Sequence, residues 1–254
     1  MWFMQFMKIK QTQNVLILAH PGHELRIHHW LEINKPRVYF LTDGSGGKEQ
    51  SRTHYSEQII EQTGSIRGSV FGDIPDKVWY KALADNDFEF IRSILQAIET
   101  DLPDVESYQI VADAVDGYNP VHDLASAMGV ALHRRLAAKG KTAKLYFSAA
   151  VPSARGNTVL DLVLDEAAKG RKLKALADYT PLAEEARRIL EQDERAINRE
   201  YIIEQDTDWS KVIIPQWEEI GRERVAAGTY PTCLTAKDHF QPAVLDLFEA
   251  KTST

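Results

Sequence analysis

Five short runs of apolar and β-favouring residues alternate with helical patterns over the first 150 residues of the 254-residue chain. Such alternation is typical of a mostly parallel sheet whose strands are joined by crossover helices, so it predicts an α/β fold. The expected strands are residues 14–19, 37–42, 68–72, 108–114 and 143–149, and the expected helices are residues 23–34, 51–63, 86–100 and 122–138.

The strand pattern stops after residue 150, and the rest of the sequence reads as mainly helical. One long helix is expected from Pro181 to about Tyr201, and two more at about 215–226 and 239–249. We therefore predict a Rossmann-like domain over residues 1–150 and a helical region over 151–254. No flexible linker separates them, so the helical region is expected to pack on the sheet domain. The sequence leaves two roles for the helical region: it forms a wall of the substrate cleft, or it forms a homo-oligomer interface.

Two histidines follow the first strand directly. The apolar run Val15–Leu18 leads into His20-Pro21-Gly22-His23, and Pro-Gly predicts a tight turn at the strand end. Ligands of open α/β sheets bind at the carboxyl ends of the strands, so both imidazoles are expected to point into that crevice. A catalytic zinc usually takes three protein ligands, which calls for one more.

A second strand leads to the third candidate ligand. Residues 109–115 read as a strand, and Asn119 and Pro120 suit the N-cap and first position of a following helix, which places His122 in its first turn. An isolated His-x-x-His is more often coincidental or structural than metal-binding. Here, however, His20 follows a strand directly, and His23 and His122 each lie in the first turn of a helix that follows a strand. This shared placement favours metal binding by the three histidines.

Three segments of the chain resemble the signature segments of the PIG-L/LmbE-like superfamily: 20–24 (His-Pro-Gly-His-Glu), 41–45 (Leu-Thr-Asp-Gly-Ser) and 119–122 (Asn-Pro-Val-His). That family comprises zinc-dependent de-N-acetylases that act on N-acetylglucosamine-containing molecules and related substrates. The resemblance covers roughly the first 150 residues. It implies zinc held by His20, His23 and His122.

The chain departs from the family pattern at three of these positions. Gly22 stands where the family has its general-base Asp, His23 where it has an Asp ligand, and Asn119 where a His assists the reaction. An amide donates a hydrogen bond but does not shuttle a proton at neutral pH. Glu24, Asp113 and Asp116 are the carboxylates closest in sequence to the proposed ligands, and one of them, Glu24 or Asp116 first, is expected to replace the missing base. Glu24 is equally explained as an anion at a helix N-terminus, and Asp116 as a loop residue.

Two further residues have both a functional and a structural explanation. Asp43 is expected to accept a hydrogen bond from a metal-ligand histidine and so orient it, or to be an ordinary turn residue. Arg52 corresponds to a family arginine that helps to hold the substrate, as Asn119 would here. Arg52 is also explained as an exposed charge on the first turn of a helix.

Composition narrows the class of protein. The formal net charge of −7 argues against a nucleic-acid surface, which would be basic. A single cysteine, Cys233, excludes an intrachain disulfide framework, and the apolar N-terminus is too short to span a bilayer and unlike a signal peptide. We expect a cytoplasmic protein with no transmembrane segment.

These observations lead to two functional hypotheses. The first is a zinc-dependent amide hydrolase, a deacetylase of an N-acetylated sugar or sugar-containing metabolite; a related version cleaves another amide or an ester. The second is a metal- or ligand-binding protein of the same fold that has lost hydrolysis along with its base. Three histidines also accept iron, cobalt or nickel, so the sequence does not choose the metal.

Overall fold

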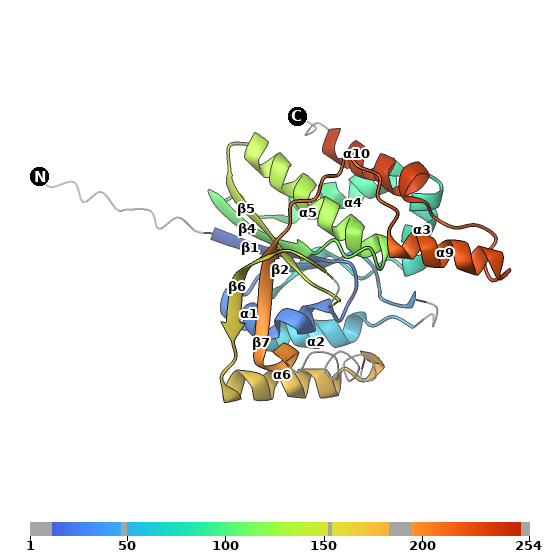
Figure 1. Cartoon of the computed structure of the whole chain (residues 1–254). Helices are drawn as coiled ribbons and strands as arrows, with labels where there is room; N and C mark the ends of the chain where they lie inside the picture. The colour runs from blue at the N-terminus through green and yellow to red at the C-terminus, as the bar shows by residue number, and fades with distance from the viewer. Residues whose placement is uncertain (1–11, 47–49, 152–153, 183–194, 250–254) are drawn as a thin grey trace, which may run out of the picture.

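The computed structural model describes residues 12–46, 50–151, 154–182 and 195–249. Its centre is a seven-stranded sheet in the order β3-β2-β1-β4-β5-β7-β6 (Figure 1). Strands β1 to β5 run parallel, and β7 pairs antiparallel with both β5 and β6. The α/β fold with a mostly parallel sheet is confirmed.

The first five strands match the predicted ones to within two residues at every boundary. They are β1 (Thr12–Leu18), β2 (Arg37–Phe40), β3 (Ile66–Phe71), β4 (Ser107–Asp113) and β5 (Thr142–Ser148). Strand β1 is central, with Leu16 paired to Val38 of β2 on one side and to Val111 of β4 on the other. The order reverses at β1 and β4, which is where open α/β sheets bind ligands.

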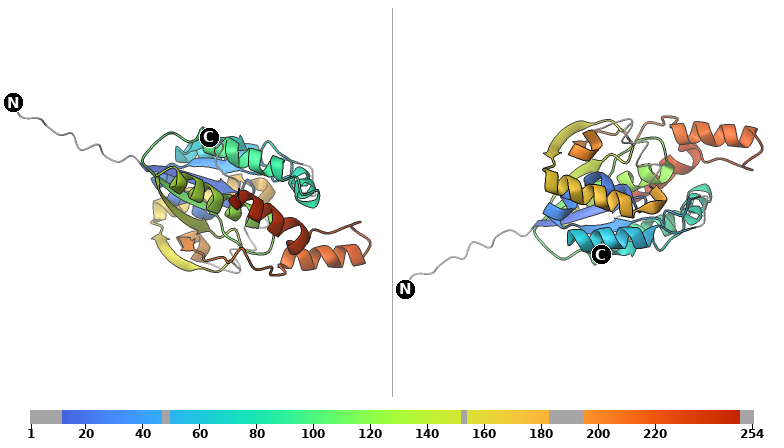
Figure 2. Two further views of the ribbon diagram at one scale, coloured as in Figure 1. Left: turned by 90° about the horizontal axis from the view of Figure 1, so that it is seen from above. Right: turned by 90° about the horizontal axis from the view of Figure 1, so that it is seen from below.

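Helices cover both faces of this sheet (Figure 2). One face carries α3 (Asp76–Ala84), α4 (Phe88–Asp101), α5 (Pro120–Ala138) and α10 (Gln241–Glu249). The other carries α1 (His28–Asn34), α2 (Thr53–Thr63) and α6 (Glu166–Asp178). The remaining elements are the short helices η1 (His23–Ile27), η3 (Thr180–Leu182), α8 (Arg195–Asn198) and η4 (Ala236–Phe240), and α9 (Gln216–Ala226).

The two helical layers explain why β1 is apolar at consecutive positions. Val15 and Ile17 belong to the core on the α4 and α5 side, whereas Leu16 and Leu18 belong to the core on the α1 side. A strand that is buried on both faces has no polar alternation. Within the described residues, no helix is both long and apolar enough to cross a membrane.

The prediction that the sheet ends at residue 150 is wrong. Two more strands, β6 (Asn157–Val163) and β7 (Arg199–Glu204), extend it. Strand β6 is a mostly exposed edge strand, and Asp161 interrupts its apolar residues. The C-terminal region is mainly helical, as predicted, but it contributes an edge of the same sheet.

The long helix predicted from Pro181 to Tyr201 lies largely outside the described residues. At its start, Thr180–Leu182 forms a single 3₁₀ turn. At its end, Arg195–Asn198 forms a short helix, and residues 199–201 belong to β7. The two other C-terminal helices are present as α9 and as η4 with α10. Helices α3 and α6 were not predicted.

Candidate functional site

The three predicted histidines come together at the carboxyl ends of β1 and β4. His20 follows β1, His23 is the first residue of η1, and His122 lies in the first turn of α5. Their ring centroids are 5.3 Å apart for His20 and His23, 5.0 Å for His20 and His122, and 4.6 Å for His23 and His122. His20 and His122 are buried.

Each ring has a carboxylate at its Nδ1 atom. His20 Nδ1 lies 3.1 Å from Asp76 Oδ1 and His23 Nδ1 lies 2.8 Å from Asp113 Oδ2. His122 Nδ1 lies 2.8 Å from Asp116 Oδ2. A carboxylate at Nδ1 fixes the tautomer and orientation of an imidazole and leaves Nε2 for another ligand. These pairs are the arrangement that accompanies metal-ligating histidines.

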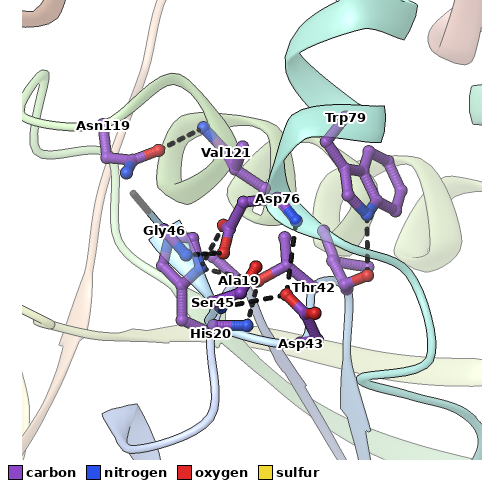
Figure 3. Close-up of polar contacts among 12 residues, drawn as sticks. Ala19, His20, Thr42, Asp43, Ser45, Gly46, Asp76, Trp79, Asn119 and Val121 are labelled. Atoms are coloured by element: carbon purple, nitrogen blue, oxygen red, sulfur yellow. Dashed lines mark hydrogen bonds and ion pairs between the residues drawn. The ribbon is translucent and has the colours of Figure 1, made fainter. Parts of the chain in front are cut away.

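The three carboxylates come from different parts of the fold. Asp76 begins α3, in the loop region after β3, and its Oδ2 also accepts a hydrogen bond from Gly46 N at 2.7 Å (Figure 3). The Thr42 hydroxyl lies 2.7 Å from His20 Nδ1 as well. Asp113 is the last residue of β4, and its Oδ2 accepts from Ala19 N at 2.6 Å, which joins the ends of β1 and β4.

Burial and neighbouring charges separate the pKa values of these groups. Burial lowers the pKa of His20 to about 4, and the charges of His122 and His23 add to this effect, so His20 is neutral at neutral pH. Burial also acts to lower the pKa of His122, but the Asp116 hydrogen bond and the nearby carboxylates outweigh it and raise that pKa. Although burial opposes ionisation of Asp76, the hydrogen bond with His20 lowers its pKa to about 2. A neutral imidazole is the form that binds a metal ion.

The donor set and ring spacing suit a zinc ion. Zinc–nitrogen bonds are about 2.0–2.1 Å long and zinc sites are tetrahedral, so rings that share a zinc ion have centroids about 5 Å apart. The observed separations of 4.6–5.3 Å agree with this value. Among the described residues, however, no three His, Cys, Asp or Glu side chains are placed so that they could hold one metal ion as they stand. Side-chain adjustment would have to accompany binding.

Gly22, in the turn between the histidines, has a backbone conformation and surroundings that disfavour a side chain. Its φ is +111°, a value that favours glycine. A Cβ atom at this position would lie 2.2 Å from Leu182 Cδ1 and 3.6 Å from Tyr179 Cζ. Residues at the end of α6 and in η3 therefore take up the space into which the general base of the family pattern would extend.

Glu24 is fully buried behind this turn. Its Oε2 accepts a hydrogen bond from Gly22 N at 2.6 Å, and its Oε1 accepts one from the Ser56 hydroxyl. Burial raises the pKa of Glu24 to about 7, against the opposing effects of these hydrogen bonds and of the Arg52 charge. No hydrogen bond joins Glu24 to any of the three histidines within the described parts of the chain.

Asp116 and Asp43 both have structural partners. Besides His122, Asp116 accepts a hydrogen bond from Tyr118 N at 2.8 Å, so both of its carboxylate oxygens are engaged. Asp43 Oδ1 accepts from Ser45 N at 2.9 Å and from Asp76 N at 3.3 Å (Figure 3). Asp76, rather than Asp43, is thus the carboxylate beside His20 Nδ1. Asp43 accepts a hydrogen bond from the backbone of Asp76.

The two predicted substrate-binding residues lie at the N-termini of two different helices. Arg52 precedes α2, packs its guanidinium against Gly44, and has a buried Nε with no hydrogen-bond partner among the described residues. Asn119 caps α5: its Oδ1 accepts from Val121 N at 2.8 Å, and its side chain also hydrogen-bonds the Tyr80 hydroxyl.

The residues that sequence reasoning missed are Thr42 and Asp76, and Asp113 was considered only as a base. Thr42 follows β2, Asp76 begins the helix after β3, and Asp113 is the last residue of β4, so all three lie at or beyond the carboxyl end of a strand. Asp76 follows a strand and a Pro75 that precedes a helix, which is the pattern that identified His122. Applying that pattern to every predicted strand would have identified Asp76.

No family model matches the sequence, and no curated protein matches it. Two solved structures are similar to this one. A deacetylase triple mutant from the teicoplanin biosynthetic pathway has 12% sequence identity, a TM-score of 0.46, and coverage of 77% of this chain and 99% of that chain. The zinc-inhibited form of teicoplanin deacetylase Orf2 has 12% identity, a TM-score of 0.44, and coverage of 77% and 100%. The fold of this chain is defined by its own sheet order and strand directions.

Proposed function

We propose that this protein is a zinc-dependent amide hydrolase whose metal ligands are His20, His23 and His122. The observation that carries the proposal is that three imidazoles meet at one edge of the sheet, each with a carboxylate at Nδ1. Structural histidines rarely need such an arrangement three times over, whereas ligands of one metal ion do.

When bound, zinc would supply Lewis-acid activation of an amide carbonyl and of water. The protein groups would prepare that chemistry. Asp76, Asp113 and Asp116 orient the rings and hold their tautomers. Arg52 and the Asn119 amide are the residues proposed to donate hydrogen bonds to a substrate.

The proposed substrate is a small molecule, an N-acetylated sugar or sugar conjugate in the cytoplasm. This part rests on the resemblance of residues 20–24, 41–45 and 119–122 to the signature segments of the PIG-L/LmbE-like de-N-acetylases. Homo-oligomer formation stays a prediction.

The proton acceptor of the reaction stays a prediction as well. Glu24 and Asp116 are the expected candidates. In each residue, both carboxylate oxygens take part in a hydrogen bond. Asp116 is better placed to orient His122 than to accept a proton.

One observation favours a second function. Residue 22 is a glycine and has no side chain that could act as the base of the family pattern. Leu182 and Tyr179 occupy the space beside it. A protein that binds a metal or ligand without hydrolysing it would keep the histidines and carboxylates and dispense with the base.

The test combines elemental analysis with a hydrolysis assay. Untagged protein, prepared without chelator, is compared with His122→Ala and with the control His133→Ala. His133 lies in a later turn of α5, and its ring hydrogen-bonds the Ala143 carbonyl of β5. We expect about one zinc per chain, lost in His122→Ala and kept in His133→Ala, and zinc-dependent release of acetate from N-acetylglucosamine conjugates. Zinc binding without turnover on a broad amide and ester panel supports the second function. No zinc binding, even when zinc is offered, overturns both metal-based proposals.

A further inference from the structure

The turn that joins His20 to His23 depends on one residue with an unusual backbone. Gly22 adopts a φ of +111°. It directly precedes His23, and only Pro21 lies between it and His20. Any rotation of this turn would move His23 relative to His20, whose ring is held by Thr42 and Asp76. The spacing of the two rings therefore depends on what holds the turn.

The Glu24 carboxylate holds it. The Gly22 N–H donates to Glu24 Oε2 at 2.6 Å, and the Ser56 hydroxyl of α2 donates to Glu24 Oε1. Glu24 is fully buried in this position. A buried carboxylate with both oxygens hydrogen-bonded is well suited to fix a backbone.

The C-terminal region closes this network from the other side. The hydroxyls of Ser56 and Tyr179 lie 3.1 Å apart, and the Tyr179 hydroxyl also donates to the Arg52 carbonyl at 3.3 Å. Tyr179 is buried at the end of α6, and Leu182 of η3 lies against Gly22. The network thus connects the turn to α2 and to α6.

We propose that Glu24 is a positioning residue: with Ser56 and Tyr179 it fixes the Gly22 turn and thereby the separation of His20 and His23. This inference rests on the proposed function for its metal-binding consequence, but not for its effect on the turn. It gives the C-terminal region a part in shaping the histidine site. It also gives Glu24 a role different from that of the proton acceptor.

The test compares Glu24→Ala with Glu24→Gln. Glutamine keeps an oxygen that accepts from Gly22 N–H and an amide that donates to the Ser56 oxygen, so it preserves the network without a basic carboxylate. The matched control is Glu99→Ala, which removes another buried carboxylate, bonded to Arg135 and Lys139. Amide hydrogen exchange of residues 19–27 is measured without metal, and zinc affinity is measured by calorimetry.

We expect faster exchange at Gly22 and zinc affinity at least about 10-fold weaker in Glu24→Ala, as for other groups that support metal ligands. Glu24→Gln should stay close to the wild type in both measurements, and Glu99→Ala should leave the 19–27 exchange unchanged. Unchanged exchange at Gly22 in Glu24→Ala would overturn the inference. So would a Glu24→Gln variant that binds zinc normally but has lost all turnover, because Glu24 would then be the base.

Two results separate this inference from the proposed function. If the wild type binds no zinc, the proposed function fails, and the exchange comparison alone decides whether Glu24 fixes the turn. If Glu24→Ala does not fold, Ser56→Ala replaces it, since that variant removes one donor to Glu24 and the link to Tyr179. Exchange at Gly22 that is no faster in Ser56→Ala than in the wild type would then overturn the inference.

Discussion

Leu182 lies so close to Gly22 that a Cβ atom on the glycine would be 2.2 Å from Leu182 Cδ1. Restoring the Asp of the family pattern by Gly22→Asp should therefore destabilise the protein. The positive φ and the steric overlap together should cost at least about 2 kcal/mol of unfolding free energy, measured in urea. Adding Leu182→Ala should recover the part due to overlap.

Gly140 provides the control for this prediction. Its φ is +76°, and within the described residues no atom beyond Gly140 and its two neighbours in the chain lies within 4 Å of where its Cβ would be. Gly140→Asp should thus show only the backbone cost. Equal destabilisation by the two Asp variants would mean that Leu182 does not restrict residue 22.

Asp76→Asn should weaken zinc binding, because an amide oxygen stabilises the required tautomer of His20 less than a carboxylate does. Supporting residues of this kind typically contribute about 10–100-fold to metal affinity. Calorimetric zinc titration measures the change. Asp73→Asn, an exposed carboxylate three residues earlier, is the control and should bind zinc as the wild type does. Equal affinities in all three proteins would separate Asp76 from metal binding.

Glu32 should give the protein a measurable pH dependence of stability. Burial acts to raise the pKa of Glu32, but hydrogen bonds from Arg171 of α6 and from His29 outweigh it and lower that pKa to about 2 from 4.5. A carboxylate with a depressed folded-state pKa stabilises the protein above its unfolded-state pKa and loses this contribution as the pH falls. Glu32→Gln should thus be less stable at neutral pH, by about 1 kcal/mol, as for other ion pairs at the surface.

The difference between Glu32→Gln and the wild type should shrink between about pH 4.5 and pH 2. Thermal unfolding over this range gives the measurement. Glu166→Gln removes a charge from an almost fully exposed side chain and should leave the profile unchanged. A constant difference between Glu32→Gln and the wild type at every pH would contradict the prediction.

Lys172→Met should be strongly destabilising. Lys172 and Glu200 form an ion pair that is buried on both sides, with Nζ 2.9 Å from Oε1. Removing Lys172 leaves the buried Glu200 charge without its cation, with only the N–H donors of His29 and Trp30, and breaking a buried pair in this way typically costs about 3–5 kcal/mol. Lys174→Met removes an exposed lysine of the same helix and should cost less than about 1 kcal/mol. Similar unfolding midpoints for the two variants in urea would refute a structural role of the buried pair.

The parts of this molecule that sequence reasoning identified share one property: a local pattern determines them. The apolar run Val15–Leu18 defines a strand buried on both faces, and the residues after it must lie at the carboxyl edge. The same reasoning applies to His122 after β4. The meeting of the three histidines follows from two adjacent parallel strands.

The missed features depend on residues distant in the sequence. Asp76 becomes the partner of His20 only because β3 and β1 belong to one sheet. The helix predicted up to about Tyr201 included the first residues of β7, and only the pairing with β5 and β6 makes that segment extended. No local pattern indicates that Leu182 lies on Gly22.

The antiparallel edge of the sheet has a consequence for synthesis on the ribosome. Strand β6 emerges before β7, yet β7 lies between β6 and the rest of the sheet. The edge therefore cannot assemble until the chain has been translated through Glu204. Helix α6, which ends directly before Tyr179, lies between these two strands in the chain. We expect the histidine turn to reach its final form late, when the newly made edge docks.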